Sequence, residues 1–267
     1  MKVATLTILL SAVWAVQAAP TVNNTQPTLG ADEALVILND GESHVIPQTE
    51  LEAFLGSFGV SMEPPPEESE TQFDNAGDTT DSTDAANSTD LQARGHIVAR
   101  GDWGNQDLVV PMSDQEFLDW DVPMSTVVYA NQRDAVLDLR GGEQIADGIK
   151  GGGGFDLTLV PDFLKVSGSG DYSKTTTAVV QGTVRFTIPA NNYGVIISRP
   201  LTKRRRGSVW SGRPENSRSV YWQADSRTPS DYTYAGGAKL RWVKGVVTTC
   251  LSKSYPIPRC HGSGVIQ

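Results

Sequence analysis

Residues 96–267 consist mainly of short β-prone segments that glycine, proline and asparagine interrupt, and this pattern constrains the fold most strongly. Two of the segments, residues 155–159 and 183–188, alternate apolar and polar residues as half-buried strands do. The other predicted strands are residues 97–98, 108–110, 125–129, 195–197 and 242–249. A capping-box signature predicts one helix, at residues 113–118. We therefore expect a mainly β domain, either a β-sandwich or an elongated twisted sheet.

A smaller unit is predicted at residues 33–60. Two apolar runs flank Asp40-Gly41, a pair that favours the tight turn of a β-hairpin. Thr49, followed three residues later by Glu52, predicts a capped short helix that runs through Phe58. A hairpin and a helix of this size cannot bury a core alone, so we expect the unit to dock on the β-rich domain.

Charge is distributed unevenly along the chain. Residues 20–95 carry 15 acidic side chains against one basic, whereas residues 199–267 carry 13 basic against three acidic. Residues 61–95 also have few large hydrophobic side chains, which predicts an acidic disordered linker. This linker is either a solvated spacer or a pro-segment that masks the basic third. The basic third favours recognition of an anionic surface over reaction chemistry.

Several features indicate export. Residues 1–18 have the charged start, apolar centre and small-residue cleavage site of a signal peptide. Cys250 and Cys260, the only cysteines, are expected to form a disulfide in an oxidising compartment. Asn23 and Asn87 stand in glycosylation triplets. We therefore expect a secreted, extracellular protein.

Motifs for catalysis are scarce. The chain has no nucleophile elbow, paired-histidine metal motif or phosphate loop, so we expect no cofactor and no metal site. Glu116, Asp119 and Asp121 bracket Trp120, and two carboxylates beside an aromatic ring are what a glycosidase needs. This cluster leaves a carbohydrate-active enzyme open as an alternative.

The candidate binding residues lie in the basic third. Four adjacent cations are expected in a loop between strands, where they would project charge toward phosphate or sulfate groups. Two tryptophans in the same region suit a membrane interface or a sugar. The candidates are Lys203, Arg204, Arg205, Arg206, Trp222 and Trp242. The alternative interpretation is a solvated hairpin tip with tryptophans in the core.

The segment at residues 166–188 begins with serine, glycine and threonine and then alternates. Strands of this composition are weakly fixed in register, so a hairpin here could re-pair or enter a membrane. Two surface strands of a sandwich are the alternative interpretation.

Three stretches resemble a known group of proteins: residues 121–125 (DVPMS), 186–204, and 236–260 with both cysteines. They resemble small secreted effector-like proteins of plant-associated fungi, over roughly residues 108–267 and, to a lesser degree, over the hairpin and helix at residues 33–58. The resemblance implies secretion and action on a host protein or surface, and it supplies no catalytic residues. The serine- and threonine-rich segment is similar in composition, rather than in motif, to the stem of aerolysin-type pore-forming proteins. This similarity would imply an aerolysin-like fold and an oligomer.

The leading hypothesis is a secreted, non-enzymatic, effector- or toxin-like protein. Its basic, aromatic C-terminal third would bind an anionic membrane surface or a glycan, and no nucleic acid is expected as a partner. The alternatives are a pore-forming protein that uses residues 166–188 and a carbohydrate-active enzyme.

Overall fold

The structure is a computed structural model. It describes residues 28–38, 43–66, 106–151, 159–166, 172–212, 218–234 and 237–267. The predicted signal peptide, both glycosylation triplets, the predicted strand at residues 97–98 and most of the predicted linker lie outside these residues.

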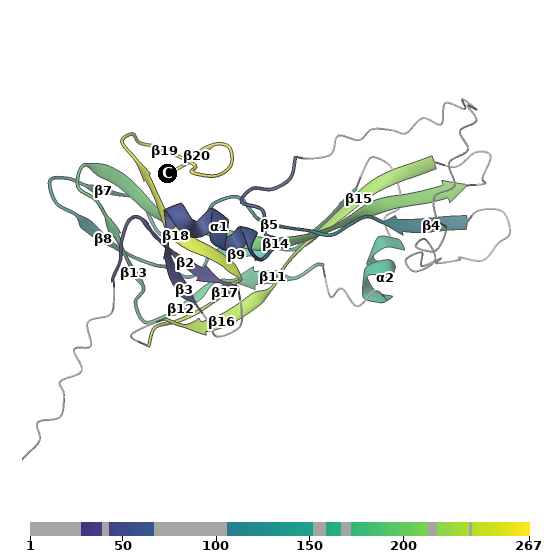
Figure 1. The fold of residues 1–267 in the computed structure, drawn as a ribbon, viewed down its shortest axis with the longest axis horizontal. Coiled ribbons are helices and arrows are strands. Elements are labelled where there is room, and N and C mark those ends of the chain that lie inside the picture. The colour runs from purple at the N-terminus through teal and green to yellow at the C-terminus, as the bar shows by residue number, and fades with distance from the viewer. Residues whose placement is uncertain are drawn as a thin grey trace, which may run out of the picture.

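The described chain is mainly β, as predicted (Figure 1). In chain order its helices are η1 (Gln48–Glu50), α1 (Leu51–Gly56) and α2 (Leu159–Val166). Strands of the first half are β1 (Thr28–Leu29), β2 (Glu33–Ile37), β3 (His44–Pro47), β4 (Gln106–Pro111), β5 (Gln115–Leu118), β6 (Val122–Pro123), β7 (Val128–Ala130), β8 (Ala135–Asp138), β9 (Gln144–Ala146) and β10 (Gly148–Gly151). Those of the second half are β11 (Thr175–Thr177), β12 (Val179–Gln181), β13 (Arg185–Ile188), β14 (Asn192–Gly212), β15 (Arg218–Arg227), β16 (Pro229–Thr233), β17 (Lys239–Val243), β18 (Gly245–Ser252), β19 (Ile257–Pro258) and β20 (Val265–Ile266).

One long strand, β14, organises the molecule, which is elongated along it (Figure 1). Residues 106–130 run antiparallel to β14 as four consecutive pieces, β4 to β7. β15 and β18 pair with successive halves of β14, against residues that β4 to β7 also pair with. Because a strand residue has one hydrogen-bonding neighbour on each side, β14 is an interior strand along nearly its whole length.

The main core lies on one face of this sheet. Ile196 and Trp242 are fully buried there, with Phe186 of the three-stranded sheet β1-β13-β8 and Leu240 of the three-stranded sheet β12-β17-β16. The indole of Trp242 donates a 2.9 Å hydrogen bond to the Ser198 hydroxyl, which satisfies its one polar atom. The arrangement is a sandwich built around a long twisted sheet, which combines the two architectures predicted from the sequence.

The N-terminal hairpin and helix dock as predicted. β2 pairs with β18 and with β3, so this unit extends the central sheet. Leu51 and Leu55 of α1 are buried against Leu118 and Val246. The contact continues at Ser61, whose backbone bonds with that of β5, so the first residues assigned to the linker belong to the docked unit.

A second, smaller core lies at the far end of the sheet, where α2 packs beneath the sheet formed by β4, β14 and β15 (Figure 1). Phe163 of α2 meets the ring of Trp222 edge-on, with 6.0 Å between the centroids. The sequence predicted no helix here. It predicted a strand at residues 155–159, of which the structure describes only Leu159, the first residue of α2.

Three local predictions were wrong. Residues 115–118 form strand β5 because β14 offers a pairing edge, which outweighs the local capping signature. The first helix begins after a 3-10 turn, and no side chain caps it. The segment at residues 166–188 forms no hairpin in its described part. β11 pairs with β9, β12 with β17, and β13 with β1 and β8.

Candidate functional site

The four cations at residues 203–206 lie inside β14, and the prediction of a loop was wrong. β5 pairs with residues 201–204 and β15 with residues 202–211, so neighbouring strands satisfy the backbone of the cationic stretch on both sides. In a strand, successive side chains point to opposite faces. The four charges are therefore divided between two faces and form no single cationic projection.

Acidic side chains meet the cations on both faces. Lys203 and Arg205 both lie beside Asp114, with N–O distances of 3.4 and 3.5 Å, and the Lys203 ammonium also lies 3.6 Å from Glu116. Lys203 and Arg205 therefore each have an acidic partner within the fold.

Arg204 has a structural role. Its guanidinium donates two hydrogen bonds to Asp225, of 2.7 and 2.8 Å, and lies 4.8 Å from the centre of the Phe117 ring. The hydrogen bond to Asp225 raises the pKa of Arg204. The paired charge holds β14 to β15 and is nearly buried, so it is not available to a surface ligand.

The two predicted tryptophans do not reach the surface. Trp222 and Trp242 are both fully buried, one in each core. Trp242 alternates with the exposed Arg241 on its strand, and Trp222 is covered by Phe163 of α2. The interpretation of these rings as core aromatics is the correct one.

The acidic cluster around Trp120 is used within the fold. Asp119 accepts a hydrogen bond from the Arg227 guanidinium and another, of 3.3 Å, from the Thr202 hydroxyl. Asp121 is 3% exposed and accepts a 2.8 Å hydrogen bond from the backbone N–H of His261. These contacts give both carboxylates positioning roles between strands.

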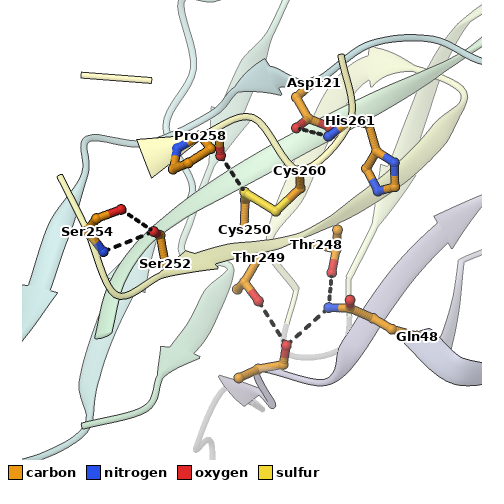
Figure 2. Close-up of a disulfide and its surroundings, with 11 residues drawn as sticks. Gln48, Asp121, Thr248, Thr249, Cys250, Ser252, Ser254, Pro258, Cys260 and His261 are labelled. Atoms are coloured by element: carbon orange, nitrogen blue, oxygen red, sulfur yellow. Dashed lines mark hydrogen bonds between the residues drawn. A yellow bond between two sulfur atoms is a disulfide. The ribbon is translucent and has the colours of Figure 1, made fainter. Parts of the chain in front are cut away.

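The predicted disulfide is present and sits beside this cluster. Cys250 and Cys260 are joined, with 5.8 Å between their Cα atoms. Figure 2 shows how the bond holds residues 258–261 against β18, with His261 beside Asp121. Arg199 of β14 is 1% exposed and donates to the carbonyl of Met62. Arg199 also lies near His261, because burial and then the Arg199 charge lower the pKa of His261. Arg199 is therefore close to both the N-terminal unit, at Met62, and the C-terminal segment, at His261.

An accessible cationic surface lies elsewhere in the basic third, on the outer face of the β12-β17-β16 sheet. β17 is the central strand, and its Leu240 and Trp242 point into the core. Lys239 and Arg241 alternate with them and are exposed. They line a hollow of about 360 Å³ together with residues of the two flanking strands.

The neighbours of the two cations in the hollow are mostly polar. The pairing register places Lys239 between Gln181 and Thr233. Arg241 lies between Val179 and Asp231, and its Nε is 3.1 Å from Asp231 Oδ1. Both partners of that ion pair are more than 60% exposed. Exposed pairs contribute little energy, so an incoming anion can compete for Arg241. Lys239 forms no ion pair with any residue that the structure describes.

Lys239 and Arg241 are not among the binding residues predicted from the sequence. Four adjacent cations are easily recognised as a candidate binding motif. Lys239 and Arg241 are separated by Leu240, so the same stretch is also typical of an ordinary strand. The alternation of Lys239 and Arg241 with Leu240 and Trp242 is the signal that identifies them. Polar side chains at every second position of a strand with an apolar inner face must point outward.

Within the described residues, no group of three or more histidine, cysteine, aspartate or glutamate side chains is placed to hold a metal ion. None of the described helices has both the length and the apolar character needed to cross a membrane. No protein-family model matches the chain, and no curated protein or solved structure matches it either.

Proposed function

We propose that the protein is a secreted, non-enzymatic, effector- or toxin-like protein that binds oxyanions displayed on a surface, through the outer face of the β12-β17-β16 sheet. The observation that carries the proposal is the hollow lined by Lys239 and Arg241, the exposed cations of its central strand. The disulfide is typical of an oxidising compartment and supports action outside the cell. The resemblance to secreted effector-like proteins of plant-associated fungi supports the same setting.

The chemistry of the hollow suits phosphate, sulfate or carboxylate groups. A guanidinium and an ammonium can each donate hydrogen bonds to such oxygens. Arg241 and Lys239 lie two positions apart on one strand, so their Cα atoms are about 7 Å apart. The Gln181 amide and the Thr233 hydroxyl add neutral donors beside Lys239. The hollow lies on the outer face of a sheet, which fits a group presented on a membrane or a polymer.

The test compares two double variants of the protein recovered from the medium of secreting cells. Lys239→Gln/Arg241→Gln removes the exposed cations, and Lys203→Gln/Arg205→Gln removes the same charge from β14. The probes are vesicles with and without phosphatidylserine, and heparin as a sulfated polysaccharide. We expect the first variant to lose about tenfold or more in affinity for the anionic probe that binds. The matched control should change it less than about threefold, because Lys203 and Arg205 do not line the hollow.

A single substitution that should strengthen anion binding provides a second test. Asp231→Asn removes the carboxylate that competes for Arg241, so anion binding should become stronger. Preference for vesicles or for heparin identifies the source of the oxyanion. Binding that neither Lys239→Gln/Arg241→Gln nor Asp231→Asn alters, or failure of every anionic probe to bind, would overturn the proposal.

A further inference from the structure

A row of three tyrosines lies at one end of the central sheet, on three separate chain segments. Tyr129 of β7 pairs directly with Tyr193 of β14, and their ring centroids are 4.6 Å apart. Tyr255 follows β18, and its ring centroid is 5.7 Å from that of Tyr193. Tyr129 is 47% exposed and Tyr255 is 55% exposed, while Tyr193 between them is half-buried. The row is thus a ridge of aromatic rings with a recessed centre.

The row rests on a rigid base. Tyr193 packs against the buried cluster of Val195, Ile197, Cys250, Ile257 and Ile266. The Cys250–Cys260 disulfide ties the C-terminal segment to that cluster. The loop that carries Tyr255 is held by its own contacts. Ser254 donates from its backbone to the Ser252 hydroxyl at 3.0 Å, as Figure 2 shows. Ring positions that are fixed before binding lose little entropy when a ligand arrives.

Among the described residues, the fold makes no use of the tyrosine hydroxyls of the row. None of the three tyrosine hydroxyls has a hydrogen-bond partner within the described structure. The turns beside the row supply further polar groups at Asn131, Gln132 and Asn191. The Asn191 N–H donates to the Asn131 carbonyl at 2.7 Å, so these turns lie side by side. Tyrosine and asparagine together give rigid contact area with adaptable hydrogen bonding, as in antibody binding sites.

We propose that this tyrosine row, Tyr129–Tyr193–Tyr255, binds a short stretch of a neutral oligosaccharide. A pyranose ring has an apolar C–H face and hydroxyls at its edge, and the row presents aromatic surface and free hydroxyls together. The centroid spacings of 4.6 and 5.7 Å are ordinary for packed aromatic rings, and together they make a row long enough to contact about two sugar units. Three tyrosines cover far less than the roughly 800 Å² per partner of a standard protein interface.

The proposal is independent of the anion site. The two surfaces lie on different strands, one on the β12-β17-β16 sheet and one on β7 and β14. Sugar binding by the row should be insensitive to salt, because neutral hydroxyls and ring contacts carry no net charge. It should also be unchanged in Lys239→Gln/Arg241→Gln, so the two proposals can fail separately.

The experiment is calorimetric titration of the secreted protein with cellohexaose, laminarihexaose and chitohexaose at low and high salt. At least one should bind, and Tyr129→Ala and Tyr255→Ala should each weaken it about tenfold. The matched control is Phe58→Ala, which removes an exposed aromatic ring from the segment after α1 and should leave the affinity unchanged. Tyr129→Phe and Tyr255→Phe keep the rings and should retain most of the binding.

Three results would overturn the proposal. The first is no binding of any of the three hexasaccharides at millimolar concentration. The second is binding that survives Tyr129→Ala and Tyr255→Ala in proteins whose urea unfolding matches the wild type. The third is tyrosine-dependent binding to neutral phosphatidylcholine vesicles without sugar binding, which would make the row a membrane-interface contact.

Discussion

Arg199 is buried in a position where charged side chains are rare. Its guanidinium donates to the Met62 carbonyl, while Nε and Nη1 have no hydrogen-bond partner among the described residues. Burial lowers the pKa of Arg199 to about 10, so it stays charged at neutral pH, and the nearby charge of Asp121 opposes that shift. A buried charge is retained only where opposite charges compensate for lost hydration.

Removing this charge should destabilise the protein. Arg199→Met keeps the volume, but it removes a positive charge near the buried Asp121 and the donor to the Met62 carbonyl. We expect the free energy of unfolding to fall by about 3 kcal/mol. Urea unfolding measures it, and the exposed Arg140→Met serves as the control. An Arg199→Met protein as stable as the wild type would show that the buried charge does not hold the two ends of the chain together.

His261 should make stability depend on pH. Burial, and then the charge of Arg199, lower the pKa of His261 below its usual value of about 6.5. The unfolded chain therefore binds a proton at a pH where the folded protein does not, and stability decreases as the pH falls through about 6.5. Between about pH 7.5 and 5.5, the wild type should lose more stability than His261→Gln in urea titrations. Equal losses would contradict the role of His261.

At the scale of elements, β14 accounts for the largest error of the sequence-based prediction, which placed its cationic stretch in a loop. Its cationic stretch resembles a turn or a loop, because four adjacent charges are unusual in the interior of a sheet. Asp225, Asp114 and Glu116 make the stretch possible, and they lie far from it in the sequence. Local patterns could not reveal these partners. The hairpin, the short helix and the disulfide were predictable because neighbouring residues specify them.

Close strand packing at Gly207 provides a test at this scale. A Cβ added at Gly207 would lie 2.3 Å from the Val110 carbonyl oxygen and 3.0 Å from the Trp222 ring. Gly207→Ala should therefore force β4 away from β14 and reduce the free energy of unfolding by about 1–3 kcal/mol. Gly148→Ala, in a strand position with open space, is the matched control. If the two variants are equally stable, β4 does not pack on β14 in this way.

The anion site in the hollow also depends on strand pairing that local sequence patterns do not specify. The charge pattern directed the prediction to residues 199–267, but the exposed cations of β17 could be identified only with the register of β16, β17 and β12. The row of Tyr129, Tyr193 and Tyr255 is even less visible in the sequence. Its members belong to three segments that meet only through strand pairing and the segment after β18.

At the scale of the whole molecule, net charge cannot draw the protein to an anionic surface. The chain carries a formal net charge of −9, so any attraction must come from a local patch. Lys239 and Arg241 form such a patch, on a different part of the surface from the tyrosine row. A protein with these two surfaces could hold a charged and a neutral ligand group at once.

The salt dependence of anion binding tests the central claim most directly. The affinity of the wild type for the preferred anionic probe is measured from low to high salt, beside the two double variants. The claim predicts a steep decrease with salt for the wild type and for Lys203→Gln/Arg205→Gln, and a much flatter one for Lys239→Gln/Arg241→Gln. The reverse result, with the flat response in Lys203→Gln/Arg205→Gln, would place the binding charge on β14 and contradict the account.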